Sequence, residues 1–207
     1  MRPRPQRLRP ERRVVLALGS NLGDRLAHLE TAVRALATTP GLRLEAVSKI
    51  VESPAWKPGG VDPEAPGYFN AVVTGSTTLE PEELLAATGA VELAGGRVRG
   101  EGEERWGDRT IDIDIVSVGG VRRDEPELTL PHPRAAERAF VLEPWLDVEP
   151  AAVLAGAGPV AALRSRVTDR VVDRPEAIAW RGARSSRGAS SSTSTAPGRP
   201  DTESSTP

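Results

Sequence analysis

Residues 109–116 read RTIDIDIV, and this short stretch decides both the fold class and the place of the site. Successive side chains of a β-strand point to opposite faces, so the isoleucines at every second position face one way and Asp112 and Asp114 face the other. The alternation predicts a strand over Thr110–Val118 that is buried on its isoleucine face. Its two carboxylates lie roughly 6–7 Å apart between their Cα atoms.

Two carboxylates on a half-buried face repel each other, which raises the pKa of one of them unless a cation lies between them. An oxygen-seeking ion such as Mg²⁺ suits this spacing. The preceding segment is rich in arginine, a residue that clamps phosphate oxygens: Arg97, Arg99, Arg105 and Arg109. The pattern therefore favours a metal-bound polyphosphate. Two alternatives stay open, a solvated strand face and a loop whose arginines pair with its own acids, Glu101, Glu103, Glu104 and Asp108.

Hydrophobic periodicity and turn residues around this strand predict an α+β fold. The expected elements are strands over 14–18, 42–51, 68–78 and 110–118, helices over 22–36 and 80–94, a third helix near 142–145, and loops over 53–67 and 97–108. The β-α-β-β-α-β order is typical of a ferredoxin-like architecture. We expect an antiparallel-rich sheet with helices packed on one face, plus a C-terminal elaboration.

Composition separates one domain from two tails. Residues 1–13 hold six arginines against one glutamate, and residues 181–207 are rich in Ser, Thr, Gly and Pro, so neither segment buries a core. We expect both tails to be disordered and the folded domain to span 14–175. Because the tails are basic while the net charge of the whole chain is −2, the domain between them is acidic. An acidic domain argues against nucleic acid as a partner.

The absence of cysteine excludes disulfide frameworks, cysteine-bound metals and thiol nucleophiles. No apolar run is long enough to span a membrane, and no apolar segment follows the N-terminal arginines as it would in a secretory signal. We therefore expect a cytoplasmic protein that acts as a monomer, without a membrane or nucleic-acid partner.

Two segments before the acidic strand carry candidate binding groups. The segment GSNLG (19–23) lies between a strand and a helix, where its amides could cradle an anion, although a turn with a helix cap is the simpler interpretation. Tyr68 and Asn70 share one face of their strand, opposite Phe69. This pair could stack a flat heterocycle and recognise its edge. Alternatively, the segment simply contributes one aromatic residue to the core and one to the rim of the domain.

Two segments beside the acidic strand carry the other candidates. His132 is followed by Arg134 and Arg138, which indicates a phosphate-facing cluster. Trp106 suits either a ligand cap in a mobile loop or an anchor for that loop.

Four segments together resemble the 6-hydroxymethyl-7,8-dihydropterin pyrophosphokinase (HPPK) family of folate biosynthesis. They are LALGSNLGDR (16–25), ESPAW with YFNAVV (52–56 and 68–73), GRVRG with RWGDRTIDIDIV (96–116), and LPHPR with RAFVLEPW (130–145). The resemblance covers residues 14–150, and the combination of the last two segments is highly specific. It implies a ferredoxin-like fold and the transfer of an intact pyrophosphoryl group from ATP to the hydroxymethyl oxygen of the pterin, with release of AMP.

The resemblance also implies roles for single residues. Asp112 and Asp114 match the carboxylates that bind two Mg²⁺ ions, and Arg97 and Arg109 complete the expected catalytic set. The expected pterin site comprises Ser53, Pro54, Trp56, Tyr68, Asn70 and Phe140. The expected ATP site comprises Glu92, Arg99, Trp106, Arg109, Ile115, His132 and Arg138, with Arg97 and Trp106 on a loop that closes over the substrates.

Three positions depart from the family pattern. Gly100 opens a longer, acidic stretch where a further base is frequent, Asp108 replaces a common proline beside Arg109, and Ala136 stands where a second histidine is frequent. The altered loop motivates an alternative function, a pterin- or nucleotide-binding module without turnover. The chain is shorter than a fusion with a second folate enzyme requires, so we expect a stand-alone protein.

Overall fold

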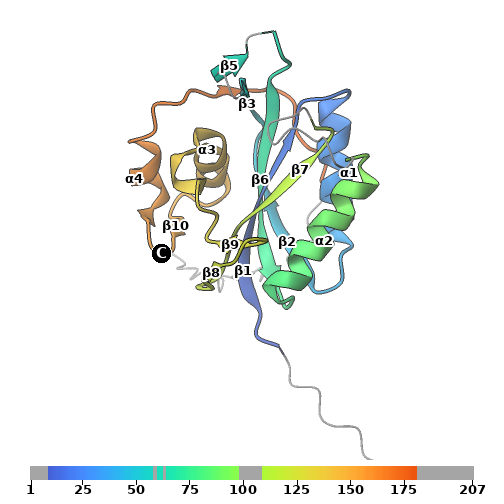
Figure 1. Ribbon diagram of the computed structural model, residues 1–207, viewed down its shortest axis with the longest axis vertical. Coiled ribbons are helices and arrows are strands. Elements are labelled where there is room, and N and C mark those ends of the chain that lie inside the picture. Colours follow the sequence, from blue (N-terminus) through green and yellow to red (C-terminus); the bar gives the residue numbers. More distant parts are fainter. Residues whose placement is uncertain (1–8, 58–59, 63, 98–108, 181–207) are drawn as a thin grey trace, which may run out of the picture.

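The computed structural model describes residues 9–57, 60–62, 64–97 and 109–180, and an antiparallel sheet forms its centre (Figure 1). The strand order is β12-β3-β6-β1-β7, and β2 also pairs with β6. These strands are β1 (Arg12–Ser20), β2 (Leu42–Val47), β3 (Val51–Ser53), β6 (Tyr68–Thr77), β7 (Asp112–Val118) and β12 (Val172–Asp173). The acidic strand expected from the alternation is β7, which lies at one edge of the sheet beside β1.

Helices cover both faces of this sheet (Figure 1). One face carries α1 (Arg25–Ala37) and α2 (Pro81–Ala94), and the other carries α3 (Ala139–Val148) and α4 (Val160–Arg164). The prediction that the helices pack on one face holds for α1 and α2 and was wrong for α3, and no helix was predicted at the position of α4. The reason lies in β1, where residues 14–18 are all buried and their side chains belong alternately to two apolar clusters, so the sheet needs cover on both sides.

Capping side chains explain where the first two helices begin. The Asp24 carboxylate accepts a hydrogen bond from the Ala27 amide at 3.0 Å and caps α1. The Glu80 amide donates to the Glu83 carboxylate at 2.9 Å as part of a capping box, with Pro81 at the first turn of α2. Both predicted helices are confirmed, and α1 begins three residues later than the leucine spacing suggested.

The strand predicted over 42–51 is divided into β2 and β3. Ser48 lies at the break, where its amide donates to the Val72 carbonyl oxygen and its hydroxyl accepts from the Val72 amide, both at 2.9 Å. Because the Ser48 hydroxyl replaces a backbone carbonyl as the acceptor for the Val72 amide, the regular strand pairing is interrupted here and resumes at Val51.

The segment predicted as a loop over 53–67 contains a short hairpin, so that prediction was wrong in part. The hairpin pairs β4 (Ala55–Lys57) with β5 (Gly60–Asp62). Of the four prolines that suggested a loop, the two that the structure describes, Pro54 and Pro66, lie outside the paired residues.

The remaining elements are short, and the chain then returns to the sheet. They are β8 (Arg123–Asp124), β9 (Thr129–Leu130), the 3-10 turn η1 (Ala135–Glu137), β10 (Val153–Leu154) and β11 (Gly158–Pro159). After α4, β12 pairs with β3, and Ile178 and Trp180 pack against the core under α1 and α2. At the other end of the described chain, β1 begins at Arg12. No helix among the described residues has the length and apolar character of a membrane span.

Gly75 provides a test of the strand packing. It lies in β6 between β1 and β2, and a Cβ atom there would collide with the Arg43 carbonyl oxygen. We expect Gly75→Ala to lower the free energy of unfolding by about 1–3 kcal/mol, the usual cost of overpacking. Gly120→Ala is the matched control, because no atom lies within 4 Å of its added Cβ. Equal urea unfolding curves for the two variants would contradict this packing.

Candidate active site

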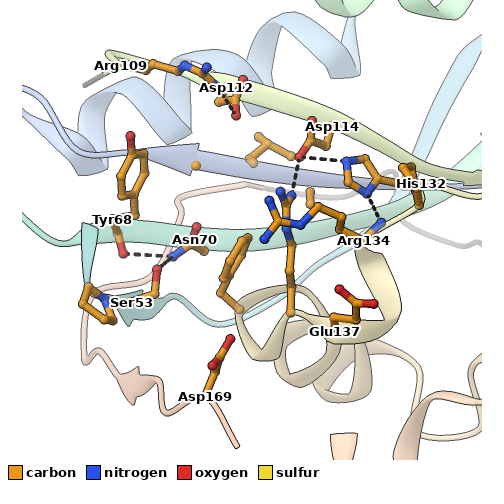
Figure 2. Close-up of a pocket in the computed structure, with 17 residues that line it drawn as sticks. Ser53, Tyr68, Asn70, Arg109, Asp112, Asp114, His132, Arg134, Glu137 and Asp169 are labelled. Carbon is orange, nitrogen blue, oxygen red and sulfur yellow. Dashed lines mark hydrogen bonds and ion pairs between the residues drawn. The ribbon is translucent and has the colours of Figure 1, made fainter. Parts of the chain in front are cut away.

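A cavity of about 600 Å³ opens on the α3 side of the sheet (Figure 2). Residues of β1, β3, β6 and β7, of the segment from 132 to 140 and of the C-terminal segment line it: Ala17, Leu18, Gly19, Ser53, Pro54, Tyr68, Asn70, Arg109, Asp112, Asp114, His132, Pro133, Arg134, Glu137, Arg138, Phe140 and Asp169. Ten of the site residues expected from the sequence are among them. Folding thus gathers segments that are far apart in the chain.

The acidic pair projects from β7 into this cavity, as the alternation predicted (Figure 2). Ile113 and Ile115 point the other way, into the core beneath α1 and α2. Ile115 was expected at the ATP site, but its side chain belongs to that core and does not line the cavity.

Asp112 is held by two arginines on either side of it. Its Oδ1 accepts a hydrogen bond from Arg97 Nη1 at 2.5 Å, and its Oδ2 accepts one from Arg109 Nη1 at 2.9 Å. All three side chains are mostly buried. Each oxygen of Asp112 therefore has a cationic partner in this state, and the charge of the carboxylate is well balanced.

Glu92, which was expected at the ATP site, lies beneath this cluster in α2 and is 2% exposed. Its Oε1 accepts hydrogen bonds from Arg97 Nη1 at 2.5 Å and from the Ile113 amide at 2.7 Å. It does not line the cavity. In this structure Glu92 links Arg97 and the backbone of β7 to α2, and so fixes the position of the acidic strand relative to this helix.

Asp114 faces an arginine and a histidine from the segment before α3 (Figure 2). Its Oδ2 accepts a hydrogen bond from Arg138 Nη1 at 3.2 Å and lies 3.7 Å from His132 Nε2. His132 Nδ1 accepts from the Arg134 amide at 3.1 Å, so the proton of the neutral ring is on Nε2 and faces Asp114. The expected phosphate-facing group of His132 and Arg138 is thus assembled around the second carboxylate.

The charges in this half of the site shift one another's pKa values. Burial raises the pKa of the Asp114 carboxyl and the charge of Asp112 raises it further, while His132, Arg138 and Arg109 oppose the rise. Burial lowers the pKa of His132, and the attraction of Asp114 opposes that change. The imidazole is therefore neutral at pH 7. In both cases burial is the largest cause of the pKa shift. Because the buried carboxylate of Asp114 is poorly solvated, the site favours the binding of a positive charge.

Away from the acidic pair, the cavity is lined by Asn70, Tyr68, Pro54 and Phe140, and we call this part the Asn70 slot. The Asn70 amide donates to Ser53 Oγ at 3.0 Å and to the Tyr68 carbonyl oxygen at 2.9 Å. These bonds use the donors of the amide and leave its carbonyl oxygen toward the cavity, which Pro54 and the Phe140 ring also line. An aromatic wall beside an oriented amide suits a planar heterocycle.

The acidic pair fits a divalent cation that prefers oxygen ligands. Asp112 and Asp114 supply two carboxylates on one face of a strand, beside arginines that suit phosphate oxygens. Across the part of the chain that the structure describes, no group of three or more His, Cys, Asp or Glu side chains forms a fuller ligand set. Bound Mg²⁺ would thus take its remaining ligands from water and phosphate, as this ion commonly does.

Some expected residues cannot be placed. Arg99 and Trp106 lie outside the described residues, as does the acidic stretch from Gly100 to Asp108. The backbone of Trp56 belongs to β4, and its side chain lies outside the described part. The alternative that the loop arginines pair with the acids of their own loop therefore stays untested.

Several lining residues were not selected from the sequence. Arg134 belongs to the phosphate-facing cluster that the sequence indicates after His132, although it was not assigned to a substrate. Glu137 and Asp169 carried no pattern that would have marked them. Asp169 comes from the chain after α4, and only the return of that segment to the sheet brings it to the cavity.

Cations gathered around an acidic pair are typical of phosphoryl-group transfer, in which a protein contributes mainly positioning and charge stabilisation. With a slot for a flat molecule in the same cavity, the site defines a nucleotide-dependent transferase.

Comparison with known proteins gives the particular family. The sequence profile of 7,8-dihydro-6-hydroxymethylpterin-pyrophosphokinase (HPPK) matches residues 15–150, and the chain belongs to this family. It is 42% identical over 144 residues to the 2-amino-4-hydroxy-6-hydroxymethyldihydropteridine pyrophosphokinase of Methylorubrum extorquens, covering 70% of this chain and 87% of the relative. It is 45% identical over 156 residues to that of Mycobacterium bovis, covering 70% and 77%.

Solved structures show the same fold. HPPK-DHPS of Plasmodium falciparum matches with a TM-score of 0.57 at 15% identity, over 77% of this chain. The match covers only 44% of that longer chain, so this chain spans less than half of it. At such low identity the likeness concerns the fold alone.

Asp114 yields a stability test in the absence of metal and nucleotide. Its pKa is raised in the folded state, so ionising it costs stability; the cost appears as the pH rises from the unfolded value near 3.8 through the folded pKa and is complete above that. We expect Asp114→Asn to raise the urea midpoint at pH 7 and to lose this advantage near pH 3.5. A lower midpoint at pH 7 would show that the contacts of the carboxylate outweigh its burial.

Proposed function

We propose how the described residues divide the work of the family's reaction, in which the pyrophosphoryl group of ATP passes to the hydroxymethyl oxygen of 6-hydroxymethyl-7,8-dihydropterin and AMP is released. The chain performs this step in folate biosynthesis. The observation that carries the proposal is a single cavity with the acidic pair at one end and the Asn70 slot at the other. A single cavity would thus bring donor and acceptor together.

The nucleotide end belongs to Asp112 and Asp114, which would hold Mg²⁺ with the triphosphate. When bound, the ions neutralise phosphate charge and polarise the phosphorus that is attacked. Arg109, Arg138 and His132 Nε2 face the same space and can donate to phosphate oxygens as negative charge redistributes. Arg97 reaches the same carboxylate from beneath.

Substrate binding exchanges partners without changing the charge balance. Before it, Arg97 and Arg109 compensate Asp112, and Arg138 compensates Asp114. Once the carboxylates bind cations, the guanidinium groups can turn to the phosphates, so the polyphosphate arrives in a site whose positive groups are already in place. This arrangement lowers the reorganisation needed for transfer.

The pterin end belongs to Asn70, Tyr68 and Phe140. The side-chain oxygen of Asn70 can accept from the amino-pyrimidine edge of the ring, because its nitrogen is committed to Ser53 and to the backbone. Phe140 and Tyr68 offer aromatic faces for stacking, and Pro54 borders the slot. The hydroxymethyl group would then point along the cavity toward the acidic pair.

Several finer assignments accompany this proposal. The strand order β7-β1-β6-β3, with α1 after β1 and α2 between β6 and β7, supports a ferredoxin-like topology. Glu92 and Ile115 would act at the nucleotide end through Arg97 and the β7 backbone, and Arg99 and Trp106 would complete it. Residues for both substrates come from one chain, which supports action as a monomer.

Turnover is tested directly with ATP, Mg²⁺ and hydroxymethyldihydropterin. We expect AMP to form in step with pterin pyrophosphate, and Asp112→Asn or Asp114→Asn to reduce the rate by at least about 10²–10³-fold, because each removes a charge-stabilising group. Exposed Asp124→Asn on β8 is the control. Tight ligand binding without AMP formation by the wild type would instead support a binding module.

Asn70 tests the pterin end separately. We expect Asn70→Ala to raise the KM for the pterin about tenfold or more, the scale of one or two lost hydrogen bonds, while the KM for ATP stays close to that of the wild type. Steady-state kinetics with each substrate varied in turn gives both constants. An equal rise in both would place Asn70 outside a pterin-specific role.

A further inference from the structure

The turn between β1 and α1 holds the backbone of Arg109 by a set of hydrogen bonds. The Asn21 amide donates to the Arg109 carbonyl oxygen at 3.1 Å, and the Arg109 amide donates to Asn21 Oδ1 at 2.7 Å. The Leu22 amide donates to the same carbonyl oxygen at 3.3 Å. Asn21 is only 1% exposed, so these bonds are shielded from water.

We propose that the GSNLG segment, residues 19–23 at the end of β1 and in the turn that follows, is a positioning element for both substrate ends of the cavity, in which Asn21 positions Arg109 and Gly19 leaves room for Asn70. The inference rests on the proposed roles of Arg109 and Asn70. It assigns the turn a task that differs from both interpretations of its sequence. The amides of Asn21 and Leu22 bind the Arg109 carbonyl rather than an anion, and the cap of α1 is Asp24.

Position at Arg109 matters because its guanidinium bonds Asp112 only three residues further along. The β1–β7 ladder ends with the pair Gly19 and Asp112, so Arg109 lies beyond the last strand pairing. Asn21 continues the support past that point by binding both the amide and the carbonyl of Arg109. If the Asn21 side chain is removed, the hydrogen bonds to the Arg109 carbonyl oxygen remain but the Arg109 amide loses its acceptor. The backbone of Arg109, and with it the position of the guanidinium group, is then less well fixed.

Gly19 connects the same turn to the acceptor end. A Cβ atom at Gly19 would lie 3.3 Å from Asn70 Oδ1 and 3.6 Å from Tyr68 Cδ1. The first of these distances is tighter than usual carbon contacts, so the Asn70 amide would have to shift. Because Gly19 also lines the cavity, an added methyl group enters the space beside the slot itself.

A kinetic split separates positioning from general folding defects. We expect Asn21→Ala to lower kcat about 10–100-fold, the scale of a small misplacement of a catalytic group, while the KM for the pterin changes little. Asn21→Asp keeps an oxygen acceptor for the Arg109 amide but also buries a charge, so a partial recovery of kcat is the expected result. Asp24→Ala, which removes only the α1 cap of the same turn, should keep the wild-type kcat at a temperature below unfolding.

A double-mutant cycle tests whether Asn21 acts through Arg109. In an Arg109→Ala background, Asn21→Ala should lower kcat no further, because the group that it positions is gone. Full additivity of the two substitutions would overturn the proposal. The wild-type AMP assay and the Asp114→Asn variant test the reaction itself, so failure of this cycle with normal wild-type turnover would concern the turn alone.

The second arm tests Gly19. Gly19→Ala should raise the KM for the pterin about tenfold with the KM for ATP nearly unchanged, which is the opposite pattern to that of Asn21→Ala. Gly120→Ala, at a turn with no atom within 4 Å of the added Cβ, is the matched control. A Gly19→Ala enzyme with an unchanged pterin KM would remove the acceptor end from the proposal.

Discussion

Repulsion between two carboxylates on one face of an edge strand is the constraint on which this site depends. The structure meets it by bringing three arginines and the N–H group of a neutral histidine from separate parts of the chain: Arg97 after α2, Arg109 before β7, and Arg138 with His132 before α3. Asp114 still has a raised pKa because burial outweighs these partners. A site prepared in this way gains from binding further positive charge together with a polyanion.

The two-sided sheet is what makes such a gathering possible. Buried residues on both faces of β1 require helices on both sides, and α3 supplies the second layer. The start of α3 then carries Arg138 to Asp114 and Phe140 to the acceptor slot. Packing that stabilises the fold therefore also builds a wall of the site. A sheet covered on one face would have left the acidic pair facing solvent.

Predictions from sequence succeeded where a short-range pattern has one physical solution. Alternation along residues 109–116 placed Asp112 and Asp114 on one face, periodic leucines placed the first helix, and Pro81 placed the second. They failed where the outcome depends on a distant partner. Ser48 divides a strand because it bonds Val72, and the proline-rich segment after Ser53 forms a hairpin that proline content argued against.

The sequence by itself determined the acidic strand, the presence of the first two helices and, through several motifs, the family, because these depend on neighbouring residues and on residue chemistry. Only the tertiary structure decided which of these sequence segments contact one another and which of their residues line the cavity. It buried Glu92 and Ile115 instead of lining the cavity with them, and brought Asp169 to the cavity from beyond the family match. It also turned Asn21 onto the backbone of Arg109. Such contacts join residues far apart in the chain, and their geometry exists only once the sheet and its two helical layers have assembled.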